Sequence, residues 1–217
     1  MSLYSINNIN SCLNIGLWEI TETRADLISE INLSSIELQQ LEQINLETKK
    51  IQWLSVRVLL KKMLGKGFQI LYSKTGKPYL KDSTLKISIS HTESFVSLII
   101  NEKEETGVDI EKANPKVERI KNKFLSLIEL SDIQNSGDFE KLLVYWGAKE
   151  SLYKVYGEKE LTFKENLFIP PFKFKKSGTI EGRIIKGNVK KNYLLNYEKI
   201  QGHILVYVLE EINLQNI

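Results

Sequence analysis

Two long helical patterns, each ended by a glycine and followed by strands, constrain most strongly what this chain of 217 residues can fold into. Residues 47–65 and 138–157 carry these patterns, and the glycine that closes each one is a typical helix stop. Arg57 and Lys149 each stand eight residues before the glycine that ends their pattern. In both patterns a leucine follows three residues later and a lysine five residues later. This echo reflects either a duplication or chance. A duplication predicts an α+β fold with two pseudo-symmetric lobes, each an antiparallel sheet packed on a long helix.

Strands are predicted on both sides of the charged stretch at residues 102–105. The alternating segments 85–90, 95–101 and 106–111 together suggest an antiparallel meander. Four more strands are predicted at residues 167–174, 178–185, 193–197 and 203–209. We place the lobe boundary in the charged stretch, which gives an N-terminal lobe of residues 1–105 and a C-terminal lobe of residues 106–217.

Composition excludes several classes of protein. The hydrophobic fraction of 42% and the charged fraction of 26% are ordinary for a soluble globular protein. The net charge of +3 suits an anionic ligand but is too small to indicate a nucleic-acid partner. With Cys12 as its only cysteine, the chain can form neither an internal disulfide nor a multi-cysteine zinc site. The start of the chain lacks signal-peptide character, and the densest apolar run is too short to span a bilayer. We therefore expect a cytoplasmic protein with no membrane partner.

Two acids stand two residues apart in Gly107-Val108-Asp109-Ile110-Glu111. In a strand, Val108 and Ile110 point to one face, so Asp109 and Glu111 share the other. The plain interpretation is a solvated strand face. Two carboxylates on one face repel each other, however, unless a cation lies nearby.

A third acid lies in the segment from Trp146 to Lys154, where Glu150 and Lys154 share one helix face at a spacing of four residues. Three carboxylates suit Mg²⁺, and a lysine suits a phosphate oxygen, so both segments together can make one phosphate-handling site. The alternative is a surface helix with ordinary ion pairing, whose core face would be formed by Trp146, Leu152, Val155 and Tyr156.

Two weaker features are polar turns in the N-terminal half. His91 follows an alternating strand and stands among hydroxyl residues in Ser88-Ile89-Ser90-His91-Thr92. Lys77 lies in the turn Gly76-Lys77-Pro78. Each is unremarkable when taken alone. The second histidine, His203, falls in an apolar strand and is interpreted as structural.

These segments together resemble the 4′-phosphopantetheinyl transferase superfamily, and most closely its longer, pseudo-dimeric surfactin-synthetase type. The segments that carry the resemblance occur in the family's order: Gly76-Lys77-Pro78, Ile89-Ser90-His91, Gly107 to Glu111 and Trp146 to Lys154. The similarity runs from about residue 53 to residue 157. The chain departs mildly from the pattern at Ser88 and Thr92, where the family often has asparagine and serine.

The resemblance implies transfer of 4′-phosphopantetheine from coenzyme A, the co-substrate, to a serine of an apo acyl or peptidyl carrier protein, releasing 3′,5′-ADP. It implies Mg²⁺ as cofactor, held by Asp109, Glu111 and Glu150. Its catalytic residues would be Glu150, Lys154 and His91. Glu150 is either general base, metal ligand or both.

Coenzyme A would be bound, by the same resemblance, by Arg57, Lys77, Ser90, His91 and Lys154. Arg57 would bind the 3′-phosphate of coenzyme A. The rival interpretation is that Arg57 is an ordinary arginine on the surface of its helix. The short members of the family have one lobe and form trimers, whereas this length agrees with two fused lobes and predicts a monomer.

Two other functions compete with the transferase. One is a family member that binds coenzyme A or a carrier protein without catalysis, and the intact Asp109, Glu150 and Lys154 argue against it. The other is a nucleic-acid-binding α+β protein that uses the lysine groups at 61–62, 173–176 and 190–191. Those lysines are scattered and interleaved with acids, which argues against a nucleic-acid surface.

Overall fold

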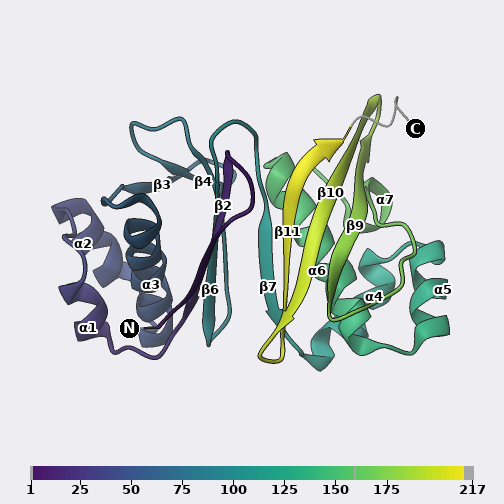
Figure 1. The fold of residues 1–217 in the computed structure, drawn as a ribbon, viewed down its shortest axis with the longest axis horizontal. Helices are drawn as coiled ribbons and strands as arrows, with labels where there is room; N and C mark the ends of the chain where they lie inside the picture. The colour runs from purple at the N-terminus through teal and green to yellow at the C-terminus, as the bar shows by residue number, and fades with distance from the viewer. Residues whose placement is uncertain (1, 159, 213–217) are drawn as a thin grey trace. The chain divides into compact units, whose positions relative to one another are not determined.

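The computed structural model describes residues 2–158 and 160–212. The chain forms two compact units, Met1–Lys103 and Glu104–Ile217. Each unit is an antiparallel sheet with an 18-residue helix packed against it, so the predicted α+β class is confirmed (Figure 1).

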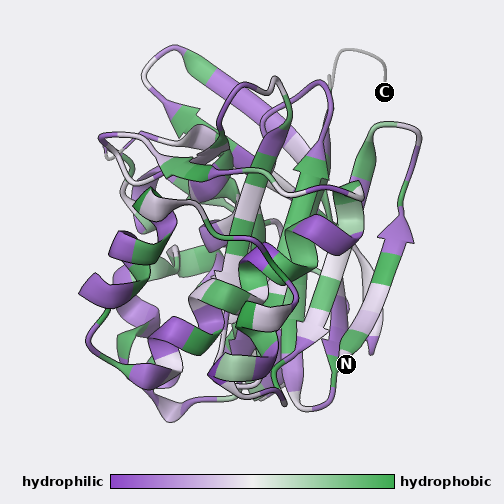
Figure 2. Ribbon diagram, turned by 90° about the vertical axis from the view of Figure 1, so that its left-hand side faces the viewer, coloured by the Kyte–Doolittle hydropathy of each residue, from purple (hydrophilic) through white to green (hydrophobic). Residues whose placement is uncertain are grey.

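The N-terminal unit has a four-stranded sheet in the order β1-β2-β6-β5 and a two-stranded hairpin, β3-β4. Its elements are β1 (Leu3–Asn8), β2 (Leu13–Glu19), α1 (Arg24–Ser29), α2 (Ser35–Gln43), α3 (Glu47–Leu64), β3 (Ile70–Tyr72), β4 (Pro78–Leu80), β5 (Lys86–His91) and β6 (Phe95–Asn101). Helix α3 packs on β2 and β6 and buries Leu54 and Val58 against Leu98 and Ile100. Figure 2 shows long apolar stretches along the strands and a mixture of polar and apolar residues on the helices.

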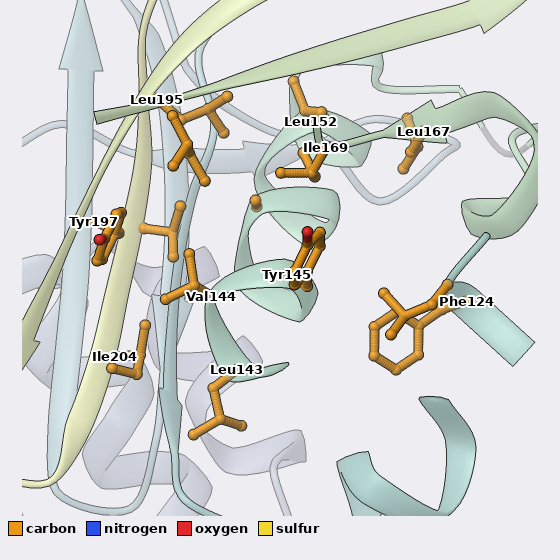
Figure 3. Packing of buried hydrophobic residues seen from close by; sticks show 14 of the residues in the cluster. Phe124, Leu143, Val144, Tyr145, Leu152, Leu167, Ile169, Leu195, Tyr197 and Ile204 are labelled. Atoms are coloured by element: carbon orange, nitrogen blue, oxygen red, sulfur yellow. The ribbon is translucent and has the colours of Figure 1, made fainter. Parts of the chain in front are cut away.

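The C-terminal unit has a five-stranded sheet in the order β7-β11-β10-β9-β8. Its elements are β7 (Val108–Lys112), α4 (Pro115–Phe124), α5 (Leu127–Ser136), α6 (Phe139–Tyr156), α7 (Phe163–Asn166), β8 (Leu167–Phe168), β9 (Ser177–Lys186), β10 (Val189–Ile200) and β11 (His203–Ile212). Helix α6 lies in the middle of the core. Its Val144 and Leu152 pack among the sheet residues Leu195 and Ile204, with Phe124 on the far side (Figure 3).

The two units share one topology at their centres. In each, the strand before the helices (β2 or β7) pairs with the last strand (β6 or β11), which pairs in turn with the strand before it. Both long helices end at a left-handed glycine, Gly65 with φ 71° and Gly157 with φ 73°, whose N–H groups bond to Lys61 and Tyr153 carbonyls. The echo seen in the sequence therefore corresponds to a repeated strand–helix–hairpin arrangement.

The predicted meander is wrong at its third strand. Strands β5 and β6 pair as expected, but β7 pairs with β11 in the other sheet. The reason is that β6 already has β5 on one edge and β2 on the other, so it offers no edge to β7. Strand β8 is also shorter than the predicted 167–174, because Pro170 and Pro171 lack the N–H groups that a sheet ladder needs.

Two short helices were missed in the sequence although each begins with a capping box. Thr23 and Asp26 cap α1, and Ser126 and Glu129 cap α5, each by reciprocal side-chain and backbone bonds. Within residues 2–158 and 160–212, no helix combines the length and apolarity needed to cross a membrane.

Candidate active site in the C-terminal unit

The site is built where α6 crosses the start of β7, and Gly107 permits the close approach. A Cβ atom at residue 107 would overlap the main-chain carbonyl of Ser151 on α6. Gly147, on the same helix, faces β11 in a similar way, since a Cβ there would lie 2.9 Å from Val206 Cγ2. The two glycines bring helix and sheet together more closely than any other residue type would allow.

Asp109 points to the interior and is paired with a lysine of the helix. Its side chain is buried, with the residue only 4% exposed, and Lys154 Nζ lies 2.9 Å from Asp109 Oδ1. The same ammonium donates to the carbonyl of Val108 at 2.7 Å. The interpretation of residue 109 as part of a solvated strand face is therefore wrong. A cation was expected beside the two acids, and the Lys154 ammonium is such a cation.

Glu111 is half-buried, and it is bound by a residue of α6 that lies on the same face of the helix as Lys154 but two turns earlier. The indole Nε1 of Trp146 donates to Glu111 Oε1 at 3.0 Å. The indole ring in turn packs edge-on against Phe124, with ring centroids 5.0 Å apart, and lies 5.6 Å from Phe163. Strand and helix are thus joined by two side-chain bonds to carboxylates, one at Glu111 and one at Asp109.

Glu150 lies between these two bonds along the helix, because Trp146, Glu150 and Lys154 follow one another at intervals of four residues. Burial raises the pKa of Glu150 to about 7, the charges of Asp109 and Glu111 raise it as well, and Lys154 opposes them. Burial and the charge of Asp109 also raise the pKa of Glu111, against the indole and Lys154. The three acids are therefore near enough to repel one another, as a cation site requires.

The chemistry of these acids fits a hard divalent cation, since carboxylate oxygens are the preferred ligands of Mg²⁺ and a cation would remove their repulsion. Among the residues that the structure describes, no three histidine, cysteine, aspartate or glutamate side chains are already gathered for metal binding. Asp109 is held instead by Lys154. The donor set fits the metal chemically without being preassembled around it.

The neighbouring Lys149 is buried, whereas a lysine on a surface helix would be exposed to solvent. It is 0% exposed and forms an ion pair with Glu129 of α5 at 2.8 Å, where Glu129 is also fully buried. Its ammonium further donates to the carbonyls of Phe124 at 2.8 Å and Phe163 at 3.1 Å. Glu129 accepts the N–H of Ile169 as well. Lys149 therefore ties α6 to Glu129 of α5 and to the main chain at Phe124 and Phe163.

The remaining predicted site residues belong to the N-terminal unit. His91 ends β5 and is exposed, Ser90 before it is half-buried, and Lys77 lies half-buried after the turn at Gly76. The structure therefore assigns the acids and Lys154 to one unit and these three polar residues, with Arg57, to the other.

Arg57 is buried, only 5% exposed, so its interpretation as a helix-surface arginine is wrong. Its guanidinium stacks 3.1 Å above the Trp53 ring, and its Nε lies 3.3 Å from Glu37 Oε1. Burial lowers the pKa of Arg57 to about 10, which leaves it charged at neutral pH. It also lines a cavity of about 440 Å³, together with Glu37 and Lys61.

The raised pKa of Glu150 predicts how stability depends on pH when no divalent cation is present. The folded carboxyl titrates near 7 against an ordinary value of 4.5, so folding takes up a proton between these values. That contribution to stability is present below about pH 4.5 and is lost as pH rises through 7. Glu150→Gln cannot ionise, so we expect it to gain about 2 kcal/mol over the parent between pH 5 and pH 8.

Thermal unfolding of both proteins with a chelator, at pH 5 and at pH 8, measures this difference. Glu140→Gln is the matched control, because Glu140 lies on the same helix in a partly exposed pair with Lys199. A Glu150→Gln effect that is equal at both pH values would show that Glu150 does not titrate near neutrality.

Comparison with known proteins finds a family whose model matches the region of these residues. Residues 105–208, from just before Gly107 through most of β11, match the model of the 4′-phosphopantetheinyl transferase superfamily. The C-terminal unit is therefore similar to this superfamily over the matched residues. The resemblance drawn from the sequence motifs is therefore confirmed, without distinguishing the surfactin-synthetase type.

Two curated relatives carry the same name, 4′-phosphopantetheinyl transferase AcpT. The one from Salmonella typhi is 28% identical over 115 residues, which cover 50% of this chain and 60% of that protein. The one from Escherichia coli K12 is 27% identical over 122 residues, covering 54% of this chain and 63% of that protein. The matched region thus spans about three fifths of the relatives' length.

Proposed function

We propose that this chain transfers the 4′-phosphopantetheine group of coenzyme A to a serine hydroxyl of an apo acyl or peptidyl carrier protein, releasing 3′,5′-ADP. The observation that carries the proposal is the arrangement of Asp109, Glu150 and Lys154 within the matched domain. It combines a carboxyl whose pKa lies at about 7 with an ammonium 2.9 Å from a buried carboxylate. These are the groups that phosphoryl transfer to a hydroxyl needs.

In this reaction the serine oxygen bonds to the phosphorus that carries the pantetheine, and the bond from that phosphorus to the bridging oxygen breaks. Glu150 would take the serine proton, and a base with a pKa near the working pH suits that task. Lys154 would offset the negative charge that develops on the departing 3′,5′-ADP. His91 would donate to a phosphate oxygen of coenzyme A.

Asp109, Glu111 and Glu150 would hold Mg²⁺, which, when bound, neutralises pyrophosphate charge as the bridging oxygen leaves. Glu150 cannot be a tight ligand and a fully available base at once. A water molecule relaying the proton to Glu150 is the alternative to direct transfer.

Lys77 and Ser90 are proposed to line the coenzyme A site, and Arg57 to meet its 3′-phosphate. The mild positive charge of the chain, +3, suits a carrier protein with an acidic recognition surface. Because one chain contains two units of like topology, we propose that it acts as a monomer.

The decisive experiment is mass spectrometry of a recombinant apo carrier protein after incubation with this chain, coenzyme A and Mg²⁺. We expect a mass increase of one phosphopantetheine group, with a serine-to-alanine carrier as the control. Carriers from fatty-acid, polyketide and peptide synthesis would each be tried. Binding of coenzyme A without any mass increase on all three would favour the non-catalytic alternative.

Arg57→Ala should destabilise the N-terminal unit by about 3 kcal/mol, because Glu37 would be left as a buried charge without its ion-pair partner. The proposed 3′-phosphate contact adds a second effect: KM should rise by about one to two decades for coenzyme A and much less for dephospho-coenzyme A. Thermal unfolding and kinetics with both substrates separate the two effects. Equal changes in KM would assign Arg57 to the fold alone.

A further inference from the structure

Trp146 has a bonding pattern that the proposed reaction does not use. Its indole nitrogen can only donate a hydrogen bond, and it donates to Glu111 Oε1 at 3.0 Å. The indole ring also packs against two aromatic rings, those of Phe124 and Phe163. A donor fixed in this way restricts where the Glu111 carboxylate can lie.

The bond from Trp146 to Glu111 lies next to the other two acids of the candidate site. Trp146 reaches residue 111 of β7, whereas Lys154, two turns further along α6, reaches residues 108 and 109. Helix and strand therefore run in opposite directions, with a side-chain bond at each end of the contact. Glu150 lies on the same helix face, midway between the two bonds.

We propose that Trp146 is a positioning residue that holds the Glu111 carboxylate toward Glu150 and Asp109, so that the three acids can bind a divalent cation. The inference rests on the proposed function, because it assumes that these acids bind a metal. Outer-shell partners of this kind fix the orientation of a ligand, and their loss typically weakens metal binding about 10–100-fold.

The plain alternative is that Glu111 merely satisfies the indole N–H of a packed tryptophan. The two interpretations predict different results when the N–H alone is removed. Trp146→Phe keeps an aromatic ring against Phe124 and Phe163 but cannot donate. If Trp146 positions Glu111, the variant should bind the cation more weakly. If Glu111 only accepts the hydrogen bond of the indole N–H, cation binding should not change.

The test uses Mn²⁺ alone as the probe, with free Mn²⁺ measured by electron paramagnetic resonance in titrations of the full chain. Trp146→Phe should raise the Kd for Mn²⁺ about tenfold. The matched control is Trp18→Phe, because Trp18 donates in the same way to a carboxylate, Glu22 Oε2 at 3.2 Å, within the N-terminal unit. That control should leave the Kd for Mn²⁺ unchanged.

A double-mutant cycle with Glu111→Gln keeps the test valid if Trp146→Phe also loosens the fold. If Trp146 acts through Glu111, the double variant should bind Mn²⁺ no more weakly than Glu111→Gln alone. Additive losses would mean that Trp146 acts by general packing and would overturn the proposal.

Unchanged Mn²⁺ affinity in Trp146→Phe would also overturn the positioning role, as would a parent protein that binds no Mn²⁺. The mass-spectrometric assay on the parent protein decides the transferase function independently. Parent activity combined with unaltered Mn²⁺ binding in the variant would leave the transferase standing and remove only the role of Trp146.

Discussion

Gly107→Ala is expected to destabilise the C-terminal unit by about 3 kcal/mol or more, and to abolish the proposed transfer activity through loss of the folded candidate site. The added Cβ would overlap the backbone carbonyl of Ser151, which cannot move without shifting α6. Helix α6 is packed on several sides, since its buried residues contact β7, β9, β11 and α4. Overlap with backbone in such a place is relieved only by repacking the core.

Urea denaturation followed by circular dichroism measures this effect, and hydrogen exchange of β7 and α6 locates it. Gly67→Ala is the matched control, because a Cβ at residue 67 meets no atom within 4 Å and its backbone has no positive φ. An unchanged midpoint in Gly107→Ala would show that α6 does not approach β7 as closely as described.

If the chain catalyses the proposed phosphopantetheine transfer, Glu150→Gln is expected to lower its kcat about 10²–10⁴-fold while leaving the KM for coenzyme A within about threefold. The amide keeps the shape of the side chain but can neither accept the serine proton nor carry the negative charge that a cation would bind. Transfer kinetics with saturating carrier protein measure both constants. Glu140→Gln, the same change in the first turn of the same helix, should leave both unchanged.

Lys154→Ala offers a contrast within the same helix face. It removes the ammonium 2.9 Å from Asp109. The proposed contact of this ammonium with the phosphate would then be lost both in the bound substrate and in the transition state. Both kcat and KM should therefore worsen. A Glu150→Gln enzyme that kept kcat but bound Mg²⁺ weakly would make Glu150 a ligand only, and a group other than Glu150 would have to act as the base.

Much of the site follows from local sequence patterns. Alternation predicted a strand through Asp109 and Glu111, and the helix through Glu150 and Lys154 was predicted to end at Gly157, as it does. Neither pattern could show that Trp146 binds Glu111, because a hydrogen bond between residues 35 positions apart leaves no periodic trace. A capping box at Ser126 and Glu129 was readable, yet it did not reveal that Glu129 would pair with Lys149.

The sequence by itself determined which segments become the two long helices and most of the strands, because apolar periodicity and helix-stopping glycines act over a few residues. Only the tertiary structure decided that β7 pairs with β11 rather than β6, and that Lys149 and Arg57 are buried with acidic partners while Lys154 reaches Asp109. A charged residue carries no local signal of burial. Its place depends on whether the fold brings an opposite charge and spare carbonyls to it, and those partners come from distant parts of the chain.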